Sequence, residues 1–457
     1  MAAYDLSTIA SCDLADEAIV EQALITAYTL YRERKGWLKL HERIEILERL
    51  VQLMSEDEDR LAYEAAQEGG KPLVDSQVEV IRAIDGIKIC IETLRTQSGE
   101  TIPMGITAAS ADRLAFTSPK PIGVVVALSA FNHPLNLIVH QVAPAIATGC
   151  PVIVKPAITT PISCSNFVAL LAKAGLPKGW CQMLMIDDHG LTAKLVSDTR
   201  VGFFSFIGSP KVGWMLRSKL AAGTRCSLEH RGAAPVIVAE DATIEDALPK
   251  LVKGGFYHAG QVCVSVQRLY AHESIARQLA DDIARHAKAL VVGYPLQKAT
   301  EVGPLISPKE VKRVSQWVNE AKAAGAQILA GGKALSPTCY APTVIYNPSA
   351  GAKVSLSEVF GPVICIYPYS DLDQAIGCAN QLSFAFQASI FTKDIEKATY
   401  VYRRLDASAV MINDHTAFRV DWMPFAGLRQ SGLGVGGIPY TMHDMQNQKM
   451  MVIANVG

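Results

Sequence analysis

The 457-residue sequence predicts an α/β protein with two domains, each a parallel sheet covered by helices. Three observations support this fold class. The chain is too long for one hydrophobic core. Continuous apolar, β-rich runs alternate with helical stretches, which is typical of parallel sheets buried on both faces. A hydrophobic content of 49% with 19% charged residues indicates a compact interior.

The first hundred residues precede this alternation, and their pattern predicts helices followed by an extended segment. Residues 15–95 are predicted to be helical, because Ile44, Leu47, Leu50, Val51 and Met54 recur at helical spacing. From Ser98 to Phe116 the chain is rich in Gly, Pro and Thr with short alternating stretches, which predicts an extended hairpin or arm.

Two series of strands and helices follow. The first has strands at Ile122–Ala130, Pro151–Val154, Cys181–Ile186 and Val201–Phe206, and helices at Leu137–Ala147, Ser163–Ala174, Leu191–Val196 and Val212–Leu220. The second has strands at Pro235–Ala239, Arg268–Ala271 and Ala388–Phe391, and helices at Ile244–Tyr257, which Pro249 could split, and Val311–Ala324. The break near Arg231 marks a domain boundary. Ligands of such sheets bind at the carboxyl ends of the strands. A final apolar strand, Lys449–Ile453, needs an edge to pair with, which another subunit could supply.

Composition excludes several function classes. The formal net charge of -1 gives no reason to expect nucleic acid or an anionic membrane as partner. The N-terminus lacks a secretory signal, and the apolar region 124–154 is interrupted by polar residues and prolines, so no membrane span is expected. The ten cysteines form no C-x-x-C pair and no zinc spacing. We therefore expect reduced thiols in a cytoplasmic protein without a metal site.

Cys263 is the candidate nucleophile. It follows Ala259-Gly260-Gln261-Val262, a small-residue turn that leaves space for a second molecule to reach the sulfur. Most cysteines are inert core residues, so the thiol alone decides nothing.

Two glycine-rich segments could bind phosphate. Gly208 and Ser209 follow a strand, and Pro210 suits the first turn of a helix whose free N–H groups could receive a pyrophosphate. Gly432–Gly437 matches G-x-G-x-x-G, but the chain ends at Gly457, too soon for the helix and acid of a dinucleotide fingerprint. A flexible loop is the better interpretation there.

Each of several polar residues at strand ends can have either a structural or a functional role. Lys155 is either solvated or a ligand of a ribose hydroxyl. Asn132 either closes a turn or donates to a developing oxyanion. Glu229 is either a surface carboxylate or a general base for water. Glu358 and Phe360 either form a turn or hold a ribose and support a flat ring.

In this order the motifs resemble the aldehyde dehydrogenase superfamily, from about Ala15 to the C-terminus. The resemblance implies that Cys263 is the nucleophile, Glu229 the general base, and Asn132 with the Cys263 N–H the oxyanion site. It also implies a cofactor site for NAD or NADP and a closing catalytic-domain motif at Asn413 and 424–434. The cofactor-binding residues would be Lys155, Gly208, Ser209, Glu358, Phe360 and Phe131.

The family fold implies a Rossmann-like NAD(P)-binding domain (residues 1–97 and 121–231) and a catalytic α/β domain (232–437). A β-hairpin oligomerisation arm (98–120 and 438–457) would make homodimers or homotetramers. The implied reaction is attack of the thiolate on an aldehyde, hydride transfer to the nicotinamide, and hydrolysis of the thioester with Glu229 as base.

The chain departs from the family pattern at five positions. His230 and Arg231 replace Leu-Gly after the base, Ala426 replaces a glycine, and Ile207 a threonine. Arg231 leaves open a catalytically impaired, cofactor-binding pseudoenzyme or oligomeric scaffold; a cofactor-independent thiol esterase is a third alternative. Ile158 stands where NAD-preferring members often have glutamate, so we expect use of both NAD and NADP.

Substrate hints lie in His133, Asn136 and Arg419. They resemble subgroups that act on lactaldehyde, phosphonoacetaldehyde or glyceraldehyde phosphate. Arg419 could pair with a carboxylate, phosphate or phosphonate, or only with Asp421. The sequence thus predicts oxidation of a small polar or anionic aldehyde.

Overall fold

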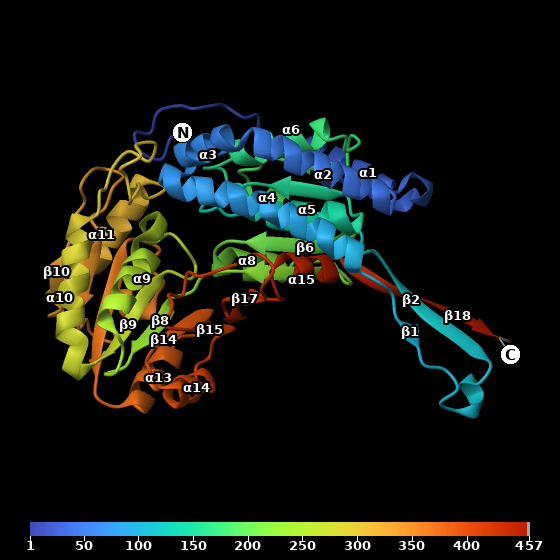
Figure 1. The fold of residues 1–457 in the computed structure, drawn as a ribbon. Helices are drawn as coiled ribbons and strands as arrows, with labels where there is room; N and C mark the ends of the chain where they lie inside the picture. The colour runs from blue at the N-terminus through green and yellow to red at the C-terminus, as the bar shows by residue number, and fades with distance from the viewer. Residues whose placement is uncertain (455–457) are drawn as a thin grey trace.

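The computed structural model describes residues 1–454 as two α/β domains and an extended arm (Figure 1). Four N-terminal helices belong to the first domain. They are α1 (Glu17–Arg32), α2 (Leu40–Glu56), α3 (Glu58–Gly69) and α4 (Leu73–Thr96), followed later by α5 (Asn136–Thr148) and α6 (Ile162–Lys173). Helices α2, α3 and α4 lie on one face of its sheet, and α1 packs on the other. The predicted helical N-terminal region is confirmed.

The first sheet has six strands in the order β17-β7-β6-β3-β4-β5. All pairs are parallel except β17 with β7. The strands are β3 (Val124–Leu128), β4 (Val152–Lys155), β5 (Cys181–Met183), β6 (Val201–Ile207), β7 (Arg225–Glu229) and β17 (Gly432–Leu433). From β3 the chain adds strands first on one side and then on the other, so a crevice opens beyond the carboxyl ends of β3 and β6. Such a topological switch point is where doubly wound sheets bind ligands.

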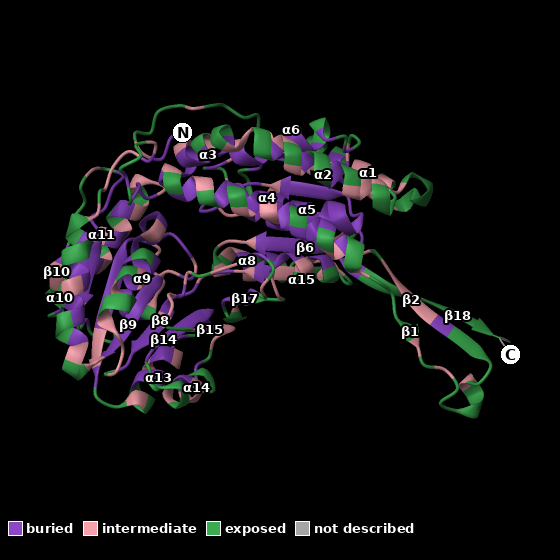
Figure 2. Ribbon diagram, in the orientation of Figure 1, coloured by how far each residue is buried: buried purple, intermediate pink, exposed green. Residues whose placement is uncertain are grey.

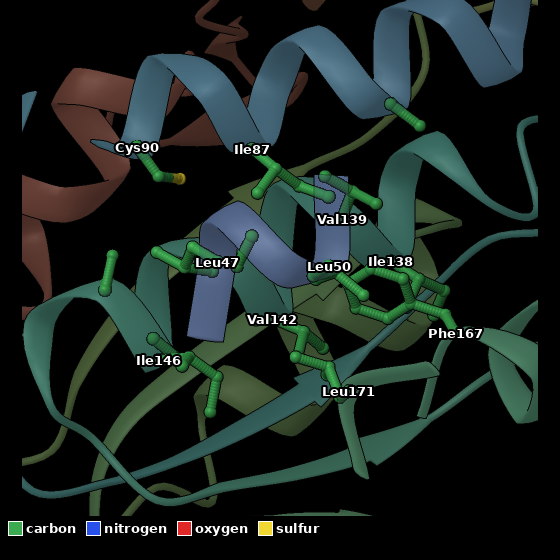
Figure 3. Packing of buried hydrophobic residues seen from close by; sticks show 14 of the residues in the cluster. Leu47, Leu50, Ile87, Cys90, Ile138, Val139, Val142, Ile146, Phe167 and Leu171 are labelled. Atoms are coloured by element: carbon green, nitrogen blue, oxygen red, sulfur yellow. The ribbon is translucent and has the colours of Figure 1, made fainter. Parts of the chain in front are cut away.

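The core of this domain lies where α2, α4, α5 and α6 meet. Leu47, Leu50, Ile87, Val139 and Phe167 interlock there without solvent exposure (Figure 3). Burying one such aliphatic side chain stabilises the fold by roughly 1.5–3 kcal/mol. This packing makes the helical layer a rigid support for the strand ends.

The second sheet has seven strands in the order β10-β11-β12-β9-β8-β14-β15, parallel except for β10 with β11. The strands are β8 (Ala234–Val238), β9 (Val266–His272), β10 (Gln327–Ala330), β11 (Thr343–Tyr346), β12 (Val363–Tyr369), β14 (Gln387–Phe391) and β15 (Ala409–Ile412). The helix α9 (Ile244–Phe256) is continuous, so the expectation that Pro249 splits it was wrong. Both sheets are buried on both faces (Figure 2), and the predicted α/β class is confirmed.

The remaining elements are short or peripheral. They are α7 (His189–Val196), α8 (Pro210–Arg217), α10 (Glu273–Ala289), α11 (Pro308–Ala323), α12 (Lys353–Leu356), α13 (Leu372–Asn380), α14 (Ile395–Tyr402), α15 (Ile438–Asp444), β13 (Phe384–Ala385) and β16 (Leu428–Arg429). Within residues 1–454, no helix combines the length and apolar character that a bilayer crossing requires. The predicted domain limits stay a prediction, and β17 pairs with the first sheet although it follows the second in sequence.

The arm is an antiparallel sheet of β1 (Thr101–Ile102), β2 (Arg113–Pro121) and β18 (Gln446–Ala454) (Figure 1). β18 pairs with β2 of the same chain over its whole length, so the C-terminal strand finds its edge without another subunit. Met450, Met451 and Ile453 remain exposed on it. The homodimer or homotetramer stays a prediction.

Candidate active site

One cavity of about 610 Å³ lies between the two sheets and receives every predicted site residue. Its lining includes Phe131, Asn132, His133, Lys155, Gly208, Ser209, Glu229, Cys263, Glu358, Phe360 and Arg419. These residues come from segments spread over nearly 290 positions of the chain. Their gathering follows from the two parallel sheets. The strands of the first sheet end at the cavity, whereas β9 and β12 of the second sheet begin just after Cys263 and Phe360.

The first sheet contributes three strand-end loops. Gly208 follows β6, and its N–H donates to the carbonyl of Glu229 at 3.0 Å. A Cβ on Gly208 would lie 2.8 Å from the ring of Phe206, so glycine is required for this close approach. Ser209 is the N-cap of α8, with Pro210 in the first turn, as predicted. The loop therefore presents backbone N–H groups to the cavity.

Lys155 ends β4 at the same edge. Burial lowers the pKa of its ammonium, and the nearby Asp187 opposes that effect. Asp187 and His189 also line the cavity, and neither drew attention in the sequence. Ile158 lies half-exposed on the rim, so no carboxylate stands there.

The nucleophile loop has unusual backbone geometry. His258 and Ala259 have φ values of 48° and 53°, and Gly260 follows at 69°. A Cβ on Gly260 would lie 2.1 Å from the carbonyl oxygen of Gly361, which only glycine avoids. Left-handed backbone at non-glycine residues costs energy and is concentrated at functional sites. This turn directs Cys263 into the cavity.

Cys263 faces Glu229 at the centre of the cavity. The thiol Sγ lies 3.8 Å from Glu229 Oε1, within the reach of a weak S–H donor. Burial raises the pKa of the Cys263 thiol well above its usual value, and the Glu229 charge adds to that effect. Burial also raises the pKa of Glu229, while Arg419 counteracts it.

A strand that the sequence did not predict fixes the position of Glu229. The residue ends β7 and pairs with Gly432 of β17 in antiparallel register. A Cβ on Gly432 would lie 2.4 Å from the carbonyl of Leu228. The glycine loop rejected as a fingerprint therefore packs directly behind Glu229.

Asn132 connects the first domain to the nucleophile loop. Its Nδ2 donates to the carbonyl of Gln261 at 2.9 Å. An amide nitrogen carries two N–H bonds, so one remains for a ligand. The backbone N–H of Cys263 has no acceptor within residues 1–454. Two donors are thus available near the sulfur.

Glu358 and Phe360 form the opposite wall. Glu358 Oε1 accepts the N–H of Gly232 at 3.0 Å, and burial raises the pKa of this carboxyl to about 8. Phe360 has φ 47° and packs edge-on to Phe131, with ring centroids 5.8 Å apart. Both rings line the cavity.

His230 and Arg231, the main departures from the family pattern, fit the structure without closing the cavity. His230 Nδ1 lies 3.1 Å from the carbonyl oxygen of Gly208, and its ring packs against Phe206. The Arg231 guanidinium lies 5.1 Å from the ring centroid of Phe384 and also lines the cavity. Its cation helps to counter the high pKa of Glu358.

The far end of the cavity holds a charge cluster. The Arg419 guanidinium lies 3.6 Å from the ring centroid of Phe425, and its Nε is 4.0 Å from Asp421 Oδ1. Asp421 instead binds Arg82 of α4, whose Nε and Nη2 donate at 3.0 and 2.6 Å. Arg82 could not be singled out from the sequence, because nothing in a helical arginine indicates a partner 339 positions away. His133 Nε2 lies 3.3 Å from the Tyr257 hydroxyl beside this cluster.

A sheet with a dinucleotide-type switch point, opposite a buried thiol–carboxylate pair, defines an oxidoreductase of the thiol-dependent class. The model of the aldehyde dehydrogenase family matches residues 2–451. The chain belongs to this family.

Relatives and solved structures cover almost the whole chain. The 3-sulfolactaldehyde dehydrogenase of Priestia aryabhattai is 38% identical over 420 residues, 92% of this chain and 87% of that protein. The lactaldehyde dehydrogenase of Methanocaldococcus jannaschii is 35% identical over 455 residues, 99% and 96% of the two chains. The crystal structure of glyceraldehyde-3-phosphate dehydrogenase GapN from the same organism, complexed with NADP, has a TM-score of 0.94 at 34% identity. It covers 99% of this chain and 98% of that one.

Proposed function

We propose that the chain oxidises a small polar or anionic aldehyde to its carboxylic acid with NAD or NADP. The observation that carries this proposal is the 3.8 Å approach of Cys263 Sγ to Glu229 Oε1 inside the shared cavity. The names of the relatives support it, because they include dehydrogenases of lactaldehyde and 3-sulfolactaldehyde.

The residues present fit a dinucleotide. The N–H groups at the start of α8 suit a pyrophosphate, and Gly208, whose own N–H bonds the Glu229 carbonyl, allows the phosphate to approach closely. Lys155 would donate to the adenosine ribose, and Glu358, which has one backbone donor, has acceptor capacity left for ribose hydroxyls. Phe360 and Phe131 would hold the nicotinamide. When bound, the oxidised nicotinamide supplies a hydride acceptor.

Carbon–sulfur bond formation comes first. Cys263 loses its proton, for which Glu229 Oε1 is the nearest side-chain acceptor, and the thiolate attacks the aldehyde carbon. The free N–H of Asn132 and the Cys263 N–H then bond the developing oxyanion. Each such donor contributes roughly 3 kcal/mol in the transition state. Loss of hydride from the carbon leaves a thioester on Cys263.

Hydrolysis completes the reaction. After the proton taken from Cys263 has passed to solvent, Glu229 takes a proton from water, the water oxygen attacks the thioester carbon, and the carbon–sulfur bond breaks to release the acid and the Cys263 thiolate. A carboxylate whose pKa is raised by burial is a stronger base than one in water. Because Glu229 must be ionised for this step and burial raises its pKa, we expect the rate to fall on acidification at a higher pH than an ordinary glutamate would cause.

The cluster at the far end selects the substrate in this proposal. Arg419 and Arg82 offer guanidinium groups to an anionic tail, and His133 offers a neutral imidazole. Burial lowers the pKa of His133 well below its usual value, so the ring is uncharged and can accept or donate one hydrogen bond. Asn136 Oδ1 is buried without a partner and lines the same cavity.

A panel of aldehydes assayed with both cofactors tests the proposal. We expect reduced nicotinamide to form with short polar or anionic aldehydes and with either cofactor. The Cys263→Ser variant should lose at least about a thousandfold in rate, because a serine hydroxyl here has no comparable acidity. Cys12→Ser, at an exposed thiol outside the cavity, is the matched control. Undiminished oxidation by Cys263→Ser would contradict the proposal.

Arg231 gives the pseudoenzyme alternative its one structural argument, because the side chain lines the cavity beside Glu358. Tight cofactor binding without any oxidation would favour that alternative. Recovery of oxidation in Arg231→Gly would then identify the arginine as the cause.

A further inference from the structure

Asp421 lies behind two cations, Arg82 and Arg419, that line the substrate end of the cavity, and it borders a second hollow on the outer side. Its carboxylate is only 3% exposed and binds Arg82 through both oxygens. Arg419 Nε lies 4.0 Å from the same carboxylate and has no hydrogen-bond partner in the described chain. Arg82 and Arg419 also line this outer hollow of about 300 Å³, so they form the wall between the two spaces.

Three more charged residues, Glu58, Asp85 and Lys88, line the outer hollow. The groups packed against the wall elsewhere change its charge little. His140 Nε2 lies 2.8 Å from Asp421 Oδ1, and burial lowers the pKa of the ring, which is therefore neutral near pH 7. Two neighbouring ion pairs cancel internally: Lys71 with Glu79, and Lys253 with Asp75. Glu229 borders Arg419 on the catalytic side.

The net charge of these groups indicates which terminal group of an aldehyde substrate this end of the cavity can bind. Two guanidinium groups against the Asp421 carboxylate leave one uncompensated positive charge, and ionised Glu229 reduces it further. We propose that the charge of Asp421 makes this end of the cavity prefer substrates whose terminal group carries one negative charge, a sulfonate or carboxylate. A phosphate ester, which carries two, would be disfavoured. This inference rests on the proposed oxidation of an anionic aldehyde.

The physical reason is desolvation. A monoanion entering the cavity loses water but meets one matching charge on the wall formed by Arg82 and Arg419. A dianion brings a second charge that finds the carboxylates of Asp421 and Glu229 nearby instead of a cation, and like charges at short range in a buried site are unfavourable. A neutral methyl tail leaves the positive charge of the wall unmatched.

Three aldehydes with the same 2-hydroxyaldehyde head separate these cases. Lactaldehyde has a neutral tail, 3-sulfolactaldehyde one charge, and glyceraldehyde 3-phosphate two charges at pH 8, since phosphate monoesters lose their second proton near pH 6. We expect kcat/KM to be highest for the sulfonate, by about tenfold over each of the others. A phosphate ester or a neutral aldehyde equal to or better than the sulfonate overturns the inference.

Asp421→Asn removes the charge and keeps the shape. The ratio of kcat/KM for the sulfonate to that for the phosphate should fall about tenfold. Equal losses with all three aldehydes would show that Asp421 only supports the structure, and would also overturn the inference. Asp85→Asn, at another carboxylate of the outer hollow, is the matched control and should leave the ratio unchanged.

A binding measurement on the wild-type protein keeps the inference separate from the proposed function. If no aldehyde is oxidised, the proposed function fails. Calorimetric titration of the cofactor-loaded protein with ethanesulfonate and with ethylphosphate at pH 8 then decides the charge preference alone. Tighter binding of the sulfonate supports the inference, and equal or weaker binding contradicts it. If Asp421→Asn does not fold, the same titration of the wild-type protein still tests the preference for one negative charge over two.

Discussion

The two ends of the cavity are built in different ways. The cofactor end lies where parallel strands of the first sheet end, with Lys155 as the last residue of β4 and Gly208 directly after β6. Its contacts are largely backbone groups in tight turns. The substrate end is made by charged side chains from α4 and from the loop before β16. There Arg82 meets Asp421 across 339 positions of the chain.

The difference separates what backbone topology determines from what side-chain pairing determines. A strand end in a parallel sheet reaches the crevice whatever the neighbouring side chains are. A buried ion pair exists only because two distant segments pack at one place, and removing one partner leaves the other charge uncompensated. We therefore expect changes near Cys263 to act on all aldehydes alike, and changes at the far end to act on particular substrates.

The largest effect of this kind is expected for Asn132→Ala. Loss of one oxyanion donor should lower kcat by about 10²–10³ for neutral and anionic aldehydes equally. Steady-state kinetics with lactaldehyde and 3-sulfolactaldehyde measure it, and Asn166→Ala on α6 is a remote control. A loss confined to anionic aldehydes would break the distinction between the two ends.

Arg419→Ala should give a smaller and more selective effect. We expect KM for anionic aldehydes to rise about 10- to 100-fold, the range for one charge-assisted contact of roughly 1.5–3 kcal/mol. KM for lactaldehyde should change little, because its tail carries no charge. If KM stays the same for every anionic aldehyde tested, the anion site is not at Arg419.

The smallest effect concerns the stability of the cofactor end. Burial raises the pKa of Glu358 from 4.5 to about 8, so the folded protein keeps this proton where the unfolded chain has lost it. Stability from this group is thus present at low pH and is lost as pH rises towards 8. Glu358→Gln removes that loss.

Thermal unfolding of the cofactor-free protein at pH 5 and pH 8 measures it. The free energy of unfolding of Glu358→Gln, relative to that of the wild type, should increase by at least about 1 kcal/mol between pH 5 and pH 8. An unchanged difference would mean that Glu358 titrates normally in the folded protein.

Much of the fold could be predicted from the sequence, because apolar runs and helical periodicity are local. β3, β4 and β6 fall within their predicted ranges, apart from one residue at the end of β6 and of β4. β7 was missed, since Arg225–Glu229 is short and only one of its residues is fully buried. Pro249 did not split α9, although the residue type argued for a break.

The residues of the candidate site that lie in sequence motifs could be predicted. Every residue singled out for catalysis or cofactor binding lines the one cavity, although their roles stay predictions. Arg82 and Tyr257 could not be selected, because their importance depends on tertiary contacts with Asp421 and His133. The accommodation of Arg231 by the Phe384 ring was also invisible in the sequence.

The most direct test of the account is the covalent state of Cys263 in the Glu229→Gln variant. With 3-sulfolactaldehyde and NADP, this variant should release about one equivalent of NADPH and then stop; this single turnover should be slower than in the wild type, because glutamine cannot take the Cys263 proton. Intact-protein mass spectrometry should show one acyl group per chain, mapped to Cys263 by peptide analysis. Continued turnover at the wild-type rate, with no acyl group on that sulfur, would contradict the account.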